Sequence, residues 1–225
     1  YTPTKPNFIG TKTVDVAIAD LVDYIDWTPF FNSWELYGKY PAILTDEVVG
    51  EQATSLFADA QKMLAQLIQE NWLTAKGVLG IFPANTVNDD DIEISPATSN
   101  QQPTTKFLTL RQQSQKTAGV PNIALADFIA PKDSGLQDYM GCFCVTTGFG
   151  VEEKAKEFEK DLDDYNSILV KALGDRLAEA FAEYLHLQVR KEIWGYASDE
   201  NLSNQELIAE NYKGIRPAPG YPACP

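Results

Sequence analysis

The last twelve residues of the chain, GIRPAPGYPACP (214–225), place a single arginine among four prolines and two glycines. The prolines fix backbone φ angles, so this segment loses little conformational entropy when it binds a ligand. Arg216 carries a planar guanidinium that suits a carboxylate, Gly220 lets a ligand approach the backbone, and Tyr221 adds an aromatic face. The pattern favours recognition of a small zwitterion or a nucleoside; the alternative is a proline-rich cap without a ligand.

A second set of polar side chains lies on the helix predicted over 171–190. Asp175, Glu179, His186 and Arg190 are spaced 4, 7 and 4 residues apart, which places them on one helix face, opposite an apolar one. Their face is either a solvated surface or the wall of a binding cleft or docking surface. Asp26, which precedes a tryptophan, is either a local turn carboxylate or a further acid that points into a site.

Other site chemistries find no support in the sequence. Gly148 and Gly150 follow a predicted strand, but Glu153 stands where a dinucleotide-binding fingerprint needs its third glycine, so we expect a plain strand-to-helix turn. His186 is the one histidine, and no GxSxG motif supplies a nucleophile. Three cysteines without a CxxC pattern argue against a disulfide framework and a structural zinc site. We expect no catalytic residue and no metal ligand.

Composition and charge exclude further classes of partner. The chain has 225 residues and a formal net charge of −14, whereas nucleic-acid binding needs an excess of lysine and arginine. No apolar run reaches the roughly 18 residues of a membrane span, and the first residues lack the apolar stretch of a signal peptide. Together with the unpaired cysteines, these features favour a cytoplasmic protein. Pro3 and Pro6 predict that residues 1–20 form an N-terminal arm or linker.

Helical periodicity is strongest in two long stretches. Apolar residues at spacings of three and four predict a helix over 45–72 and a second helical region over 151–195, broken near Asp163. A short helix is predicted to begin at Thr28, with proline in its first turn. The SNQE sequence at 203–206 is a capping box that opens a last helix.

Four strands are predicted between the two long helical regions. They cover 77–82, 91–95, 106–110 and 139–148, the last with Cys142 and Cys144 on one face. Strands grouped between helices are typical of an α+β domain with a mostly antiparallel sheet.

Four stretches of sequence together resemble a known family. They are IDWTPFFNSWELYGKYPAIL (25–44), LADFIAP (125–131), DRLAEAFAEYLH (175–186) and WGYASDENLSNQELIAENYKGIRPAPGYPACP (194–225). With them the chain resembles the C-terminal activation domain of cobalamin-dependent methionine synthase over nearly its whole length after residue 20. The resemblance implies one C-shaped α+β domain at 21–225, with a twisted antiparallel sheet flanked by long helices and no Rossmann architecture.

The resemblance also implies a function. Methionine synthase moves a methyl group from methyltetrahydrofolate to homocysteine through cobalamin, and its cobalt(I) form is occasionally oxidised to inactive cobalt(II). The activation domain then binds S-adenosylmethionine and presents its methyl group, while a flavodoxin or diflavin reductase supplies an electron. The implied partners are this reductase and the cobalamin-binding domain, which holds the cobalamin.

The family's ligand-binding positions fall on Asp26, Glu179, Arg216, Ala218, Gly220 and Tyr221. Within the family's R-x-x-x-G-Y motif, Arg216 is expected to meet the methionyl carboxylate, and the backbone near Ala218 is expected to line the ligand. Asp175 is expected to contact the partner cobalamin domain.

One departure from the family pattern limits these expectations. The family domain continues past the position of Pro225 into a segment whose aromatic residues complete the site, so we expect a pocket that is open on one side. Because the folate, homocysteine and cobalamin modules are absent from the sequence, we expect this chain alone to be inactive as a methyltransferase. The alternative is a docking domain that engages a cobalamin protein or reductase without binding S-adenosylmethionine.

Overall fold

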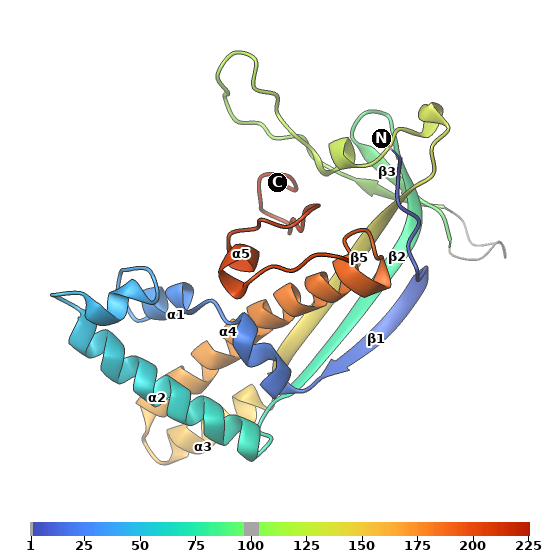
Figure 1. Cartoon of the computed structure of the whole chain (residues 1–225). Coiled ribbons are helices and arrows are strands. Elements are labelled where there is room, and N and C mark those ends of the chain that lie inside the picture. The colour runs from blue at the N-terminus through green and yellow to red at the C-terminus, as the bar shows by residue number, and fades with distance from the viewer. Residues whose placement is uncertain (1, 97–103) are drawn as a thin grey trace.

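The structure, a computed structural model, describes residues 2–96 and 104–225. It contains a five-stranded sheet in which all pairings between the described strands are antiparallel. The strands are β1 (Gly10–Val16), β2 (Thr74–Val87), β3 (Asp91–Ile94), β4 (Thr105–Leu108) and β5 (Asp138–Phe149). The sheet curls along its length, and its long strands run diagonally across Figure 1.

Strand β2 is the centre of the sheet and contacts three other strands. β5 follows one edge of β2, while β1 and then β3 pair with the opposite edge; Ala84 is paired with Asp138 on one side and Ile94 on the other. β4 extends the sheet beyond β3. The length of β2 therefore joins the two ends of the domain.

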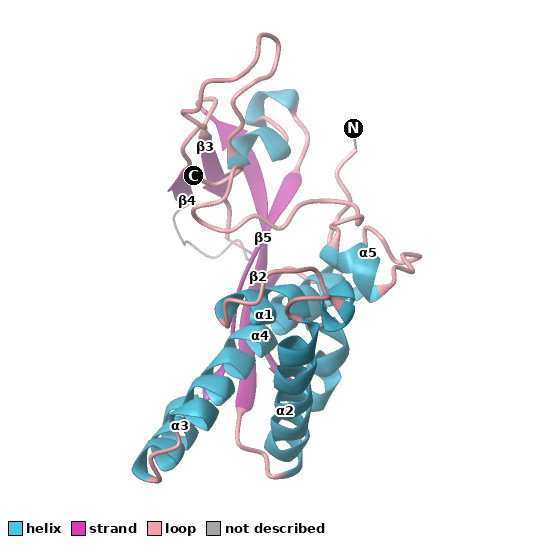
Figure 2. Ribbon diagram, turned by 90° about the vertical axis from the view of Figure 1, so that its left-hand side faces the viewer, coloured by secondary structure: helices cyan, strands magenta, loops and turns pink. Residues whose placement is uncertain are grey.

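In the described part of the chain, five α-helices pack on this sheet or at its ends. They are α1 (Trp27–Ser33), α2 (Gly50–Gln69), α3 (Val151–Lys160), α4 (Asp164–Gln188) and α5 (Asn204–Ile208). A π-helical turn (Val189–Ile193) continues α4, and a 3-10 helix, η1 (Ile18–Tyr24), precedes α1. In Figure 2 helices α1 to α4 gather at one end of the long strands, and β3 and β4 lie at the other end.

The main core lies between α4, the sheet and α2. Leu169, Leu173, Leu177 and Phe181 of α4 have no exposed surface, because they face β2, β5 and the helices at that end. Gly77 on β2 allows close packing here, since a Cβ at that position would lie 3.1 Å from Cζ of Phe181. A smaller core under β3 contains Ala84, Ile92, Ile94, Ala126 and Ile129.

The break predicted in the second helical region is confirmed. Asp163 is the N-cap of α4, and its Oδ1 accepts the backbone N–H of Asn166 at 3.0 Å. The expected glycine turn also forms: Gly150, with φ of 99°, lies between β5 and α3. The α+β class with an antiparallel sheet is likewise as predicted.

The N-cap of α1 differs from the prediction. Asp26, and not Thr28, occupies the N-cap, because its Oδ1 accepts the backbone N–H of Thr28 at 3.0 Å.

The predicted N-terminal arm contains a strand. Residues 10–16 form β1 and pair with residues 75–81 of β2. Before this strand, Nε1 of Trp194 donates to the carbonyl of Thr4 at 2.8 Å, and the N–H of Phe8 donates to the carbonyl of Ile193 at 3.0 Å. Sequence analysis missed β1 because only Val14 and Val16 carry an apolar alternation, between exposed polar residues. Described residues of the N-terminal segment therefore hydrogen-bond both with the sheet and with the turn after α4.

Candidate functional site

Helix α4 carries a row of three carboxylates. Asp175, Glu179 and Glu183 follow one another at intervals of four residues, so they lie on neighbouring turns of one helix face. The side chains of Asp175 and Glu179 are exposed, whereas that of Glu183 is 8% exposed. The row thus begins at the surface and ends beneath another segment of the chain.

Helix η1 brings Asp26 toward the same part of α4. The ring of Tyr24 packs edge-on against that of Tyr184, with 5.3 Å between ring centroids. Asp26 follows two residues later, is half-buried, and caps α1. Asp26 therefore has the predicted local role of a turn carboxylate beside the buried Trp27.

The segment that covers Glu183 is the arginine-bearing tail. Nη2 of Arg216 donates to Oε2 of Glu183 at 2.9 Å, and the arginine side chain is 22% exposed. Among the described residues, none accepts a hydrogen bond from Nε of Arg216, which is buried. The predicted carboxylate-binding guanidinium therefore lies at the end of the acidic row and is paired with its last member.

A buried cluster surrounds this pair. Arg190 has no exposed surface, and its Nε and Nη2 donate to the carboxylate of Glu200 over 2.7–3.1 Å. Its Nη1 lies 2.7 Å from Nδ1 of His186 and 3.8 Å from Oε1 of Glu183. The guanidinium also stacks over the ring of Tyr212, 4.2 Å from its centroid.

The position of this cluster corrects one prediction. His186 and Arg190 were expected on an accessible polar face with Asp175 and Glu179, but His186 is 5% exposed and Arg190 is fully buried. The reason is that the loop after the π-helical turn and the C-terminal tail fold back over this end of α4, bringing Glu200 and Tyr212 onto it. The helix face is polar throughout, but only its first half is open to ligands.

Burial and the two arginines set the charge states in the cluster. The pKa of His186 is lowered to about 3, first by burial and then by the positive charges of Arg190 and Arg216. Because Arg190 donates to Nδ1, the neutral imidazole carries its proton on Nε2. Burial raises the pKa of Glu183, and the nearby Arg216 and Arg190 oppose this shift.

The last predicted site residues form an exposed turn. The N–H of Gly220 donates to the carbonyl of Cys224 at 2.8 Å, and that of Tyr221 donates to the carbonyl of Ala218 at 3.1 Å. Tyr221 is 64% exposed, and Ala218 and Gly220 are exposed as well. In Figure 1 the C-terminal segment, in red, lies in the opening between the helical end and the β3 end of the domain.

Two cavities of the described structure lie away from this site. One, of about 810 Å³, is lined by residues near the end of β2 and by Arg111 and Asp127. The other, of about 220 Å³, lies between α2, α3 and the start of α4. Neither of these two cavities is lined by Asp26, Glu179 or Arg216.

Sequence analysis missed Glu183, Glu200, Tyr212 and Tyr24. Glu183 could have been found, since it continues the four-residue spacing of Asp175 and Glu179. Glu200 and Tyr212 come from irregular segments whose return to α4 no local pattern indicates.

In the described residues, no group of three or more His, Cys, Asp and Glu side chains is placed to hold a metal ion. Over the same part of the chain, no helix combines the length and apolar character that crossing a membrane requires.

The family model described as the activation domain of vitamin B12 dependent methionine synthase matches residues 17–225. The chain belongs to this family. The activation domain is therefore a module of a methyltransferase that also has a cobalamin-binding domain. This match confirms the resemblance carried by the four sequence stretches.

A solved structure supports the same assignment. The crystal structure of the MetH reactivation domain bound to AdoHcy (S-adenosylhomocysteine) is 57% identical in sequence to the activation domain described here. The two agree with a TM-score of 0.93, and the match covers 100% of this chain and 69% of that chain. The similarity confirms the expected fold as well as the family.

Proposed function

We propose that this activation domain binds S-adenosylmethionine and presents its methyl group for the reductive reactivation of cobalamin. The observation that carries the proposal is the position of Arg216, held by the tail at the buried end of the acidic row on α4. The similar MetH reactivation domain was solved with AdoHcy, which has the same adenosine and amino-acid groups.

The charges of the site match those of the ligand. S-adenosylmethionine has a carboxylate, an ammonium and a sulfonium, so it needs one cationic group and nearby acids. Arg216 supplies a planar guanidinium with unused N–H donors for the carboxylate. Asp26 and Glu179, on elements that meet at the Tyr24–Tyr184 contact, supply negative charge for the ammonium and sulfonium.

The exposed turn completes this arrangement. Backbone groups from Ala218 to Tyr221 lie two to five residues after Arg216 on the open side of the site. Among the described residues, and apart from its two chain neighbours, no atom lies within 4 Å of the position that a Cβ at Gly220 would take, so the backbone there is accessible to a nucleoside. The ring of Tyr221 provides a face for stacking.

The partner domain and a reductase have further roles in the proposed reaction. When held by the partner domain and reduced by one electron from a flavodoxin or diflavin reductase, cobalamin would supply the acceptor for the methyl group of the sulfonium, and S-adenosylhomocysteine would remain as the other product. We propose that Asp175, which lies on the exposed part of the row, faces the cobalamin domain. The proposal includes a cytoplasmic location, and this chain alone is expected not to turn over.

The docking-only alternative is less well supported. It predicts a site that has lost its ligand groups, whereas Arg216 and the acidic row are present, and the similar structure contains AdoHcy.

Replacing Arg216 with alanine tests the proposal. We expect Arg216→Ala to weaken S-adenosylmethionine binding by about ten- to a hundredfold, since a hydrogen-bonded charge pair contributes roughly 1.5–3 kcal/mol. Isothermal titration calorimetry measures this directly. Lys213→Ala, which removes an exposed cation three residues earlier, is the matched control and should bind as the wild type does. Equal affinity for Arg216→Ala and the wild type would refute the assignment.

A further inference from the structure

We infer that Glu183 is a positioning residue that holds the guanidinium of Arg216 in the orientation needed for the ligand carboxylate. This inference rests on the proposed function and adds a residue that the family pattern did not indicate. It concerns affinity and not chemistry, because Glu183 lies beneath the arginine and does not need to touch the ligand.

The contacts of Glu183 hold its carboxylate in one position. Its side chain is 8% exposed and lies on the rigid helix α4, while Arg216 comes from an irregular tail. Oε2 accepts from Nη2 of Arg216 at 2.9 Å, and Oε1 faces Arg190 at 3.8 Å. A carboxylate that lies between two guanidiniums has little freedom to turn away from them.

Tyr212 supports the same guanidinium from the tail itself. Burial raises the pKa of the Tyr212 hydroxyl, and the positive charge of Arg216 opposes this shift, so the two side chains are neighbours. Tyr212 is in turn packed on His186 and Arg190, with ring centroids of Tyr212 and His186 4.8 Å apart. Arg216 is thus held in place by Glu183 on α4 and by Tyr212, which itself packs against His186 and Arg190.

Glu183 could instead compete with the ligand for Arg216, but the geometry favours positioning. The carboxylate takes one N–H of Nη2, in a single contact, and does not occupy both arms of the guanidinium. Arg216 has five N–H donors, so further N–H groups remain for a ligand carboxylate beside those that face Glu183 and the Tyr212 hydroxyl. A competitor would be expected to fill the fork that the ligand needs.

The expected loss of affinity in a Glu183 variant follows from the greater conformational freedom of the Arg216 side chain. Immobilising a long side chain on binding costs enough free energy to weaken affinity by about tenfold. When Glu183 is present, this ordering has already occurred on folding. Replacing Glu183 should therefore lower the affinity only for ligands that contact the guanidinium, namely ligands with a carboxylate.

The experiment compares two probes on the full 225-residue chain by calorimetry. S-adenosylhomocysteine has the amino-acid carboxylate, and 5′-methylthioadenosine lacks it. Glu183→Ala should weaken S-adenosylhomocysteine by about tenfold and leave 5′-methylthioadenosine within about twofold. Glu183→Gln, which keeps a hydrogen-bond acceptor for Arg216, should recover part of this loss and serves as the readout if the alanine variant does not fold.

Glu200→Gln is the matched control, because Glu200 pairs with Arg190 in the same cluster and makes no contact with Arg216 among the described residues. It should lower thermal stability without changing the ratio of the two affinities. Equal losses for both probes in the Glu183 variants, or no loss, would overturn the inference and leave the proposed function standing. A wild-type chain that binds neither probe would overturn both.

Discussion

At the residue scale, the unexpected feature is a buried, charge-balanced cluster at the end of α4. Two guanidiniums, those of Arg190 and Arg216, face two carboxylates, those of Glu183 and Glu200. His186 adds a neutral acceptor. Buried charges are tolerated when they are paired and hydrogen-bonded, so the cluster fixes where the tail lies on the helix, and through it where Arg216 stands.

His186 gives this cluster a measurable pH dependence. Its folded-state pKa of about 3 lies below the 6.5 of an unperturbed histidine. Between these values the unfolded chain binds more protons, so this contribution to stability is complete above about pH 6.5 and is lost as the pH falls toward 3. The slope approaches about 1.4 kcal/mol per pH unit. Groups facing His186 are Arg190, Arg216 and Tyr212, with Glu183 on its own helix.

His186→Asn isolates this contribution, because asparagine keeps an acceptor near the position of Nδ1 and does not titrate. Urea unfolding at pH 5.0, 6.0 and 7.5 should show a smaller fall in unfolding free energy with acid than in the wild type. The raised pKa of Glu183 makes the unfolding free energy rise with acid above pH 4.5, which is opposite to the effect of His186. Because both proteins contain Glu183, this effect does not distinguish them. Parallel curves for the two proteins would mean that His186 titrates normally in the folded state.

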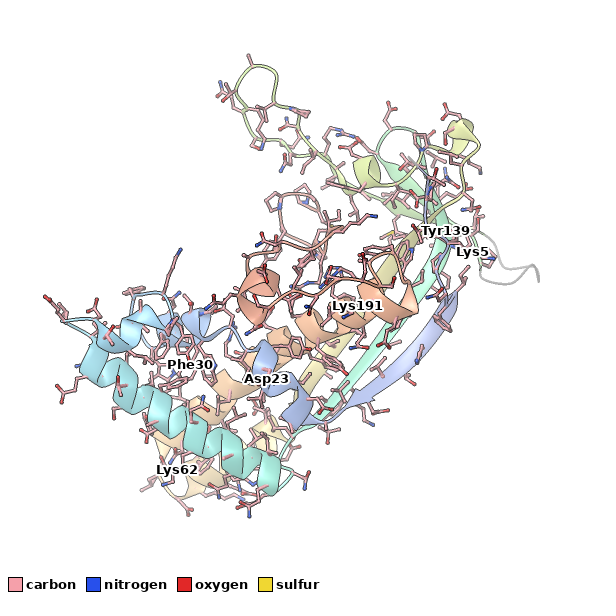
Figure 3. All side chains as sticks on the ribbon, viewed as in Figure 1. Lys5, Asp23, Phe30, Lys62, Tyr139 and Lys191 are labelled. Carbon is pink, nitrogen blue, oxygen red and sulfur yellow. The ribbon has the colours of Figure 1, made fainter. Side chains whose placement is uncertain are left out.

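At the element scale, α4 is the platform for the site because it contacts η1, α1, the sheet and the tail. In Figure 3 Asp23 marks η1 and Lys191 marks the turn after α4, with the helix between them. Its periodicity made the helix, its break at Asp163 and its acidic row predictable from local sequence. Local sequence could not indicate which part of the polar face is covered, because Glu200 and Tyr212 reach it through tertiary contacts.

The junction between β5 and α3 depends on Gly150. A Cβ there would lie 2.0 Å from the carbonyl oxygen of Trp72, and φ is 99°. Gly119 also has a positive φ, of 87°, but a Cβ there would meet nothing within 4 Å. Gly119→Ala is the matched control, because it places an alanine at a positive φ without a steric clash.

We expect Gly150→Ala to destabilise the domain by roughly 3 kcal/mol or more and Gly119→Ala by about 1 kcal/mol. Chemical denaturation measures both differences. Similar small losses for the two variants would show that the β5–α3 turn can shift away from Trp72 without cost.

At the scale of the whole molecule, sequence reasoning succeeded where patterns are local or where the family motif is long. The antiparallel sheet, the long helices and Arg216 beside an acidic helix were predicted. β1 was not, because an edge strand with two apolar residues gives a weak signal. Nor was the Glu183–Arg216 pair, which joins residues 33 positions apart.

The N-terminal segment links the sheet to the end of α4, and this link gives a prediction for the whole domain. β1 pairs with β2 over seven residues, while Thr4, Asn7 and Phe8 hydrogen-bond with residues 192–194, just after Arg190. The ring of Trp194 also packs against that of Tyr139 on β5, with 6.2 Å between ring centroids.

A chain that begins at residue 17 should lose roughly 2–5 kcal/mol of unfolding free energy, because several net-favourable hydrogen bonds and the burial of two valines are removed. Hydrogen exchange should then accelerate at the amides of β2 that face β1 and at the indole N–H of Trp194, which loses its acceptor on Thr4. A chain lacking only residues 1–3 removes none of the described hydrogen bonds of this segment and should behave as the full chain. Unchanged stability and exchange in the longer deletion would mean that the segment is the independent arm suggested by its prolines, and that β1 contributes nothing to the domain.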